Sequence, residues 1–332
     1  FFQAEDGIRD FCLSRGLGDV YKRQRTFFIF EARLLIKLMN TIKGLSAIIF
    51  MTLNTAAVWS VLWFWVIQRI WTSGDKLVGL RERMDKIIWW WTGGNRWLLK
   101  TLNLTEPDID WKHIDEVSLD KWYLVISNHQ SWTDIILLQS YLYGQIPPLK
   151  FFTKQQLIWV PGIGLAMYVL GFPYVKRVSK AQIKANPNLR KADRDNISEA
   201  CKGFKNHPTS ILNFLEGTRR TTTKRLNQSS EYDNLLKPKI GGIEYVIKDM
   251  GDYLHKLIDV TIVYPDGTPT FWQFVKGECR SVKFVVSHHE IPVEVLVDND
   301  IERRSSLSAW IKTIWQHIDG QISDITRKSN VS

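Results

Sequence analysis

The chain has 332 residues, enough for one substantial domain with an appendage or for two small domains. Hydrophobic residues make up 45% and charged residues 23%, which excludes a disordered chain, and three cysteines are too few for a disulfide framework. The net charge of +10 indicates an anionic partner: nucleic acid, an acidic lipid, or a phosphorylated or CoA-bearing substrate.

The tryptophans are unevenly distributed along the chain. Eight of the 15 lie between Trp59 and Trp97. Because tryptophan concentrates where an apolar medium meets water, this cluster favours a membrane over a nucleic acid as the partner. Nucleic-acid binding is disfavoured further because the basic residues are spread along the chain and form no basic helix.

The first residues differ from the rest. Residues 1–24 show no useful periodicity and resemble translated adapter sequence joined to a reading frame. We therefore expect the native protein to begin near Met39, and we treat residues 1–38 as a non-native leader. Without the seven basic and five acidic residues of this leader, the chain carries a net charge of +8.

Residues 44–67 form a stretch of 24 residues without a charge. About 20 apolar residues span a bilayer core, so this stretch predicts a transmembrane helix, with a buried core helix as the alternative. Only Lys43 lies between Met39 and the span, whereas five basic residues follow it closely: Arg69, Lys76, Arg81, Arg83 and Lys86. By the positive-inside rule, the C-terminal part of this single-pass protein then lies in the cytoplasm.

Residues 80–104 are amphipathic. Basic side chains alternate with apolar ones. The apolar side chains recur at near-helical spacing, at Ile87, Trp91, Leu98 and Leu102. This pattern predicts an interfacial helix that lies along the membrane surface instead of crossing it. The alternative is an ordinary helix docked on the domain that follows.

From residue 106 onwards, short apolar runs alternate with amphipathic stretches. Four runs that are apolar on nearly both faces predict strands: residues 122–126, 210–214, 257–263 and 282–286. Helices are predicted over residues 131–143, 190–204 and 240–249, with a terminal helix over residues 307–325. The sequence therefore predicts an α/β fold, a single domain over residues 106–325 with a mainly parallel mixed sheet flanked by helices.

The first predicted strand is followed by SNHQSWTD, residues 127–134. Ser131 and Asp134 have the spacing of a capping box, so a helix is expected to begin there. Asp134 can then reach back to one ring nitrogen of His129, which fixes the tautomer and leaves the other nitrogen as a general base. A packed histidine beside a capping aspartate is the alternative.

The strand over residues 210–214 is followed by LEGTRR, residues 215–220. A flexible glycine, a hydroxyl and two guanidinium groups thus leave the end of a buried strand. Open α/β sheets bind ligands at strand ends, and an arginine fork matches phosphate oxygens. The alternative is a strand end capped by solvated arginines.

Together these segments resemble the motifs of the PlsC-like glycerolipid acyltransferases, the 1-acylglycerol-3-phosphate acyltransferase superfamily. Asn128-His129-x4-Asp134 is similar to the first motif, and residues 214–219 are similar to the third, with Leu215 in place of the common proline. Residues 171–177 stand where the second motif is expected, and residues 260–265 loosely match the fourth. Within the family, residues 154–164 and 235–247 look most like bacterial YihG-type acyltransferases.

The resemblance implies a role for each of these residues. His129 would deprotonate the acceptor hydroxyl, and Asp134 would orient His129. The acceptor site would be formed by Glu216, Gly217, Thr218 and Arg219, with Arg177 and Lys154 as further contacts to an anionic headgroup. The oxyanion donor is expected among the backbone N–H groups near the 129–134 junction.

The implied function is transfer of a fatty acyl group from acyl-CoA or acyl-carrier protein to a lysophospholipid, first of all lysophosphatidic acid to phosphatidic acid. No cofactor is expected, and no metal, because His288-His289-Glu290 lacks a second histidine four residues on. The expected location is the bacterial inner (cytoplasmic) membrane, with the catalytic domain facing the cytoplasm. The alternatives are a lysocardiolipin-like acceptor or a non-catalytic protein that binds anionic lipid.

Overall fold

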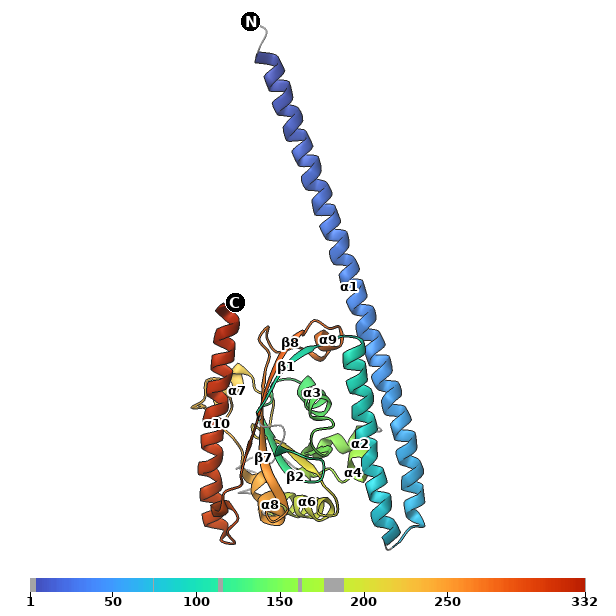
Figure 1. Ribbon diagram of the computed structural model, residues 1–332, viewed down its shortest axis with the longest axis vertical. Coiled ribbons are helices and arrows are strands. Elements are labelled where there is room, and N and C mark those ends of the chain that lie inside the picture. The colour runs from blue at the N-terminus through green and yellow to red at the C-terminus, as the bar shows by residue number, and fades with distance from the viewer. Residues whose placement is uncertain (1–3, 74, 113–115, 161–162, 176–187, 332) are drawn as a thin grey trace.

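The computed structural model describes residues 4–73, 75–112, 116–160, 163–175 and 188–331, and it has the predicted α/β architecture (Figure 1). Six strands form one sheet in the order β1-β8-β7-β2-β6-β3. Every neighbouring pair is parallel except β7 and β8, so the sheet is mixed and mainly parallel. The strands are β1 (Glu106–Trp111), β2 (Trp122–Ser127), β3 (Leu149–Phe151), β6 (Ser210–Phe214), β7 (Leu254–Val263) and β8 (Ser281–His289).

The four strands predicted from apolar runs are β2, β6, β7 and β8. β2 and β7 lie in the middle of the sheet and are buried along nearly their whole length, which explains why apolar residues predominate in both. The two edge strands were not predicted. β1 is largely exposed and carries three acidic residues, and β3 has only three residues, so neither produces an apolar run.

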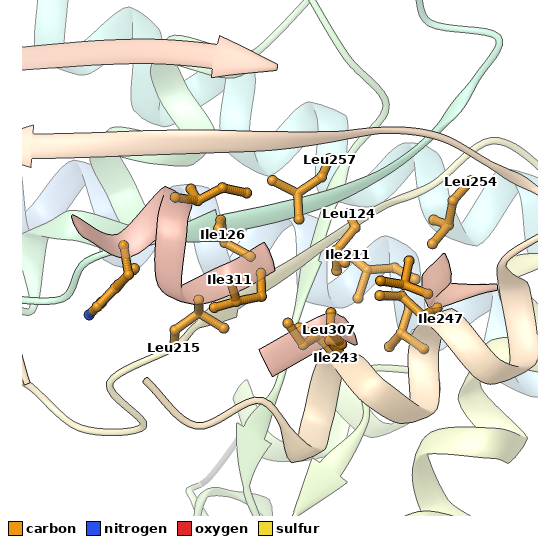
Figure 2. Close-up of a cluster of buried hydrophobic side chains, with 14 of the residues drawn as sticks. Leu124, Ile126, Ile211, Leu215, Ile243, Ile247, Leu254, Leu257, Leu307 and Ile311 are labelled. Carbon is orange, nitrogen blue, oxygen red and sulfur yellow. The ribbon is translucent and has the colours of Figure 1, made fainter. Parts of the chain in front are cut away.

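Helices cover both faces of this sheet. α6 (Asn188–Phe204), α8 (Gly241–Met250) and α10 (Asp300–Val331) pack against one face, around buried side chains such as Leu124, Ile211 and Leu257 (Figure 2). α3 (Thr133–Leu142), α9 (Phe271–Val275) and the end of α2 (Asp75–Thr101) pack against the other face. The predicted helices correspond to α3, α6, α8 and α10.

Shorter elements connect these layers. β4 (Thr153–Lys154) and β5 (Tyr174–Val175) pair in parallel as a second, two-stranded sheet. The other short elements are η2 (Gln155–Trp159), α4 (Ile163–Val169), α7 (Thr222–Asn227) and η3 (Val293–Val295).

A long helix, α1 (Ala4–Ile70), forms a hairpin with α2 beside the domain (Figure 1). Its segment Ile29–Ile70 is long and apolar enough to cross a membrane, and only 11% of its most apolar window is buried. This segment contains the predicted span of residues 44–67, whose crossing of a bilayer stays a prediction. α1 continues without a break through residue 38, so the secondary structure marks no boundary there, and the origin of residues 1–38 also stays a prediction.

α2 lies between α1 and the domain (Figure 1). Asn54 on α1 donates to the carbonyl oxygen of Trp91 at 3.0 Å, and the indole N–H of Trp91 donates to Thr55 at 3.0 Å. On its other side, α2 reaches the domain through the Arg96 guanidinium, which donates to the carbonyl oxygen of Tyr143 at 2.7 Å. The predicted amphipathic helix is therefore docked on both neighbours, and its position at a membrane surface stays a prediction.

Candidate active site

The two motif segments leave the sheet side by side. β2 and β6 are parallel neighbours, and their last residues, Ser127 and Phe214, are register partners. The segments that begin at Asn128 and Leu215 therefore emerge together at the carboxyl edge of the sheet, where open α/β folds bind ligands.

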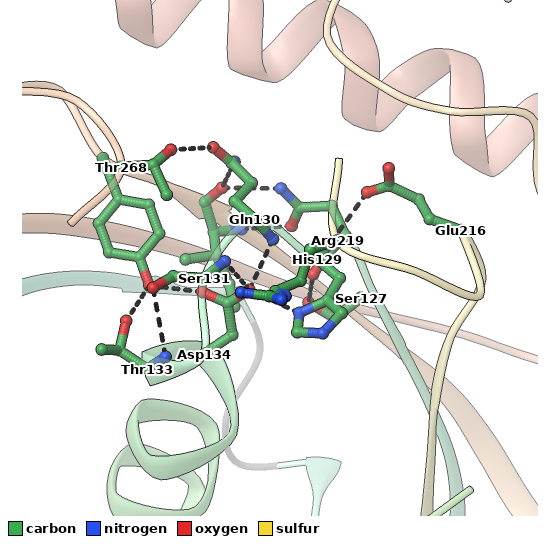
Figure 3. A network of polar contacts seen from close by, with 12 residues as sticks. Ser127, His129, Gln130, Ser131, Thr133, Asp134, Glu216, Arg219 and Thr268 are labelled. Carbon is green, nitrogen blue, oxygen red and sulfur yellow. Dashed lines mark hydrogen bonds and ion pairs between the residues drawn. The ribbon is translucent and has the colours of Figure 1, made fainter. Parts of the chain in front are cut away.

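His129 and Asp134 meet in the way the sequence predicted. His129 Nδ1 lies 2.8 Å from Asp134 Oδ2 (Figure 3). Asp134 is fully buried, and the His129 side chain is 13% exposed. Since an ionised carboxylate only accepts hydrogen bonds, this contact places the imidazole proton on Nδ1 and leaves the Nε2 lone pair free to take a proton.

The capping box expected at this junction is only half present. The backbone N–H of Ser131 donates to Asp134 Oδ2 at 2.9 Å, as a capping box requires. The Ser131 hydroxyl donates to the carbonyl oxygen of Pro269 at 2.9 Å, and its oxygen accepts the backbone N–H of Thr133, the first residue of α3, at 3.3 Å. The hydroxyl therefore caps the N–H of Thr133 instead of that of Asp134, and it also binds the loop between Pro265 and α9.

Asp134 also holds the loop that carries His129. Its Oδ2 accepts from the backbone N–H of Gln130 at 2.7 Å as well as from that of Ser131 (Figure 3). The backbone N–H of His129 itself donates to Glu216 at 2.9 Å. These three amides are therefore occupied by carboxylates, and the oxyanion donor near this junction stays a prediction for the other backbone N–H groups.

Asn128 fixes the start of the loop to the neighbouring strand. Its side-chain amide donates to the carbonyl oxygen of Ile262 at 2.9 Å, and its side-chain oxygen accepts from the Ile262 N–H at 2.8 Å. Asn128 thereby continues the pairing of β2 with β7 beyond the last backbone pair.

Glu216 is buried and bound to main chain. Its Oε1 accepts the His129 N–H, and its Oε2 accepts the Leu236 N–H at 3.2 Å. Burial raises the pKa of Glu216 to about 8, against these two amides and Arg220, which lower it. The observed contacts make Glu216 a tie between the His129 loop and the segment around Leu236, and its contact with an acceptor stays a prediction.

After Glu216, the segment that follows β6 turns sharply and becomes partly exposed. Gly217 has φ of +67°, a left-handed conformation that favours glycine, and a Cβ there would meet the Lys239 side chain at 3.0 Å. The Thr218 hydroxyl accepts from Lys224 Nζ at 2.8 Å. The Arg219 guanidinium lies 4.3 Å from the centre of the Trp132 ring, a cation–π contact that positions it beside the His129 loop.

The two remaining predicted contacts lie elsewhere in the chain. Lys154 is in β4, and its register partner in β5 is Val175. Arg177 lies outside the described residues. The structure therefore does not place either side chain at the His129 site, and both roles stay predictions.

Three residues at this site were missed by sequence reasoning. Phe214 stacks on the His129 ring with 4.1 Å between ring centres, and Trp132 lies under Arg219. The Tyr264 hydroxyl lies 2.5 Å from Asp134 Oδ1. The available signal was position, because each stands within or next to a segment that leaves the carboxyl edge of the sheet.

Within the described ranges, no group of three or more His, Cys, Asp or Glu side chains could hold a metal ion.

Comparison with known proteins identifies the domain. Residues 108–270 match the family model described as Acyltransferase. Lysocardiolipin acyltransferase 1 of Danio rerio is 28% identical over 160 residues, which is 44% of this chain and 38% of that protein. The Gallus gallus protein of the same name is 26% identical over 207 residues, 58% of this chain and 51% of that one.

A plant protein and a solved structure extend the likeness. Probable 1-acyl-sn-glycerol-3-phosphate acyltransferase 5 of Arabidopsis thaliana is 23% identical over 226 residues, 63% of this chain and 55% of that protein. The chain thus spans about half the length, or less, of these curated relatives. The crystal structure of the 1-acyl-sn-glycerophosphate (LPA) acyltransferase PlsC from Thermotoga maritima has the same fold, with TM-score 0.50, 17% identity, and coverage of 87% of this chain and 98% of that one.

These comparisons support the family predicted from the motifs, while closeness to the YihG type stays a prediction. Residues 108–270 match the Acyltransferase family, and the chain has the fold of the solved PlsC structure.

Proposed function

We propose that this protein transfers a fatty acyl group from acyl-CoA or acyl-carrier protein to the free hydroxyl of a lysophospholipid, converting lysophosphatidic acid to phosphatidic acid. The observation that carries the proposal is the 2.8 Å contact between His129 Nδ1 and Asp134 at the carboxyl edge of the sheet. It supplies a general base without a protein nucleophile, which suits a reaction in which the acceptor brings its own hydroxyl.

The reaction then needs no acyl-enzyme. His129 Nε2 takes the proton from the acceptor hydroxyl as its oxygen attacks the thioester carbonyl. The new C–O ester bond forms, the C–S bond breaks, and the thiolate leaves with the proton that His129 has held. Between these two proton transfers Asp134 stabilises the imidazolium, because it accepts a hydrogen bond from the Nδ1–H of His129.

Arg219 supports an acceptor with a phosphate headgroup. Its guanidinium is held by Trp132 at the same edge of the sheet, and a guanidinium binds phosphate oxygens in pairs. The names of the relatives include both lysocardiolipin and 1-acylglycerol-3-phosphate acyltransferases, and both acceptors contain a phosphate diester or monoester. Lysocardiolipin is therefore the second candidate acceptor.

The membrane is the expected source of both lipid substrate and product. The apolar segment Ile29–Ile70 supports association with a bilayer. By the positive-inside rule, the basic residues after it support the proposal that the domain faces the cytoplasm at a bacterial inner membrane.

The test is thiol release by the full chain in detergent, with an acyl-CoA donor and a panel of lysophosphatidic acid, lysocardiolipin and lysophosphatidylcholine, followed by mass spectrometry of the lipids. His129→Ala should lower kcat by about 10²–10⁴, the usual contribution of a general base. His289→Ala is the matched control, because His289 also pairs with a buried carboxylate, Asp259 at 2.6 Å, but on another part of the sheet. Undiminished acyl transfer by His129→Ala would overturn the proposal, and the preferred lipid decides between the two acceptors.

A further inference from the structure

Tyr264 approaches the His129–Asp134 pair from a distant part of the chain. It directly follows β7, the central strand beside β2, and only 6% of it is exposed. Its hydroxyl oxygen lies 2.5 Å from Asp134 Oδ1, the oxygen that His129 does not use. Tyr264 and His129 thus bind opposite oxygens of one carboxylate.

The direction of each hydrogen bond follows from chemistry. An ionised carboxylate only accepts, so the Tyr264 hydroxyl donates its single proton to Asp134. The Thr133 hydroxyl, 3.0 Å from the Tyr264 oxygen, must then donate to that oxygen. Burial and the Asp134 charge raise the pKa of Tyr264 well above its usual value, so this donor stays protonated at any working pH.

The resulting chain runs from Thr133 through Tyr264 to Asp134 and ends on His129. Hydrogen bonds linked in this way polarise one another. Three donors hold Asp134 Oδ2, and all three come from the loop of residues 129–131, which moves with the histidine. Tyr264 is the contact that ties the carboxylate to the central sheet, and it draws negative charge towards Oδ1 and away from the histidine.

We propose that Tyr264 is a positioning residue of the acyltransferase, whose hydroxyl orients Asp134 and weakens its hold on the His129 imidazolium, so that His129 is neutral and ready to act as a base. The inference rests on the proposed role of His129. Without the hydroxyl, Asp134 becomes a stronger acceptor for the Nδ1 proton, the imidazolium is stabilised, and the neutral base is available only at higher pH.

Other charged and titratable groups surround the pair and remain unchanged by a substitution of Tyr264. They come from the segment after β6, from the loop after β7 and from the segment between α9 and β8: Glu216, Arg219, Arg220, Asp266 and Cys279. Burial raises the pKa of Glu216 to about 8, so this carboxyl adds a background to the pH profile. A difference between the wild type and a Tyr264 variant therefore reports the hydroxyl and not these neighbours.

The experiment compares pH profiles of kcat for the wild type, Tyr264→Phe and Tyr123→Phe. Tyr123 is the matched control, because it is a fully buried tyrosine of β2 whose hydroxyl is also hydrogen bonded, to the Ser118 N–H at 2.8 Å. Tyr264→Phe should move the acidic limb up by about half to one pH unit, with KM for the thioester unchanged. Tyr123→Phe should leave the limb where it is.

A second variant and a second readout keep the test decisive. Thr133→Val leaves Tyr264 in place but removes its donor, so it should move the limb in the same direction by a smaller amount, and it carries the test if Tyr264→Phe does not fold. In protein labelled with ¹⁵N-histidine, the Nδ1 proton resonance, assigned by its loss in His129→Ala, should move downfield in Tyr264→Phe. This readout needs no turnover, so it is independent of the proposed function.

The outcomes separate the two ideas. If the wild type releases no thiol with any lysophospholipid, the proposed function fails, while the resonance still tests the contact. An acidic limb and a resonance that are both unchanged in folded Tyr264→Phe would overturn the inference, as would an equal shift in Tyr123→Phe.

Discussion

Side-chain carboxylates hold three backbone N–H groups of the loop after β2, while the His129 carbonyl oxygen accepts the Arg220 N–H at 2.7 Å. Asp134 accepts the N–H groups of Gln130 and Ser131, and Glu216 accepts that of His129. Asp134 belongs to the helix that follows the loop, whereas Glu216 belongs to the segment that follows the neighbouring strand, β6. The position of the base therefore depends on two acidic residues from separate elements.

The difference between the pKa of Glu216 in the unfolded state and its pKa in the folded state predicts how the free energy of unfolding varies with pH. The pKa of its carboxyl rises from 4.5 to about 8 on burial, so the folded state holds this proton more tightly than the unfolded state. This contribution is complete below pH 4.5 and is lost as pH rises to about 8. For a buried carboxyl it amounts to a few kcal/mol at most.

Glu216→Gln should expose this linkage. An amide cannot ionise, and its NH₂ group faces the Leu236 N–H, so the variant should be less stable than the wild type at low pH. The gap should narrow as pH rises towards 8, because only the wild type loses stability there. Thermal unfolding between pH 4.5 and 9 measures the gap, with the surface variant Glu302→Gln as control. A gap that stays constant or widens with pH would contradict the assignment.

Residues within one short segment could be assigned from sequence, and residues joined by the fold could not. His129 and Asp134 are five residues apart at one strand–helix junction, so their contact followed from local geometry. Tyr264 is 130 residues away from Asp134 and reaches it only because β7 lies beside β2. The main-chain contacts of Glu216 likewise depend on the pairing of β2 with β6.

At the scale of elements, the hairpin of α1 and α2 is held by a buried apolar cluster that includes Leu62 and Ile87 and by a close crossing at Gly94. A Cβ on Gly94 would lie 2.7 Å from the Asn54 side chain, and that side chain donates to the Trp91 carbonyl oxygen and to Asn95. Glycine thus lets α1 approach α2 closely enough for Asn54 to bind the α2 backbone. Nearer the start of α2, the Asp85 carboxylate accepts a hydrogen bond from Lys150 of β3 at 2.8 Å, which ties the hairpin to the domain.

Gly94→Leu should therefore loosen the hairpin. The new side chain displaces Asn54 and removes its hydrogen bonds, so we expect a loss of about 1–3 kcal/mol, as is typical of overpacking. Gly79→Leu is the matched control on the same helix, because no atom lies within 4 Å of a Cβ there, and leucine favours a helix over glycine. Thermal unfolding of both variants in detergent measures the difference. Equal stability of the two would show that the crossing contributes nothing.

Strands with a continuous apolar run could be predicted from the sequence, whereas strands that form only because a neighbouring strand pairs with them could not. β6 was predicted with its observed bounds, because a buried central strand must be apolar. β1 carries Glu106, Asp108 and Asp110 and forms a strand only because β8 offers it a parallel partner. No local pattern marks such an edge strand.

At the scale of the whole molecule, one side of α1 remains apolar and uncovered. α2 and α9 take one side of the helix, through Asn54 and through contacts around Gly44. The opposite side exposes a row of large apolar side chains one helical turn apart: Ile42, Leu45, Ile49 and Leu53. A row of this length in water is unfavourable by roughly 1.5–3 kcal/mol per side chain, and a bilayer removes that penalty.

The prediction is that this row holds the protein on membranes. Ile49→Asp with Leu53→Asp should lower the fraction of full-length protein that floats with phosphatidylcholine vesicles by more than about tenfold, because each charge opposes insertion by about 2.5–3.5 kcal/mol near the bilayer centre. Val293→Asp with Ile301→Asp is the matched control, since these side chains are 76% and 82% exposed but belong to η3 and to the first turn of α10. The control should float like the wild type. If both double variants float equally well, α1 is not the membrane-binding element.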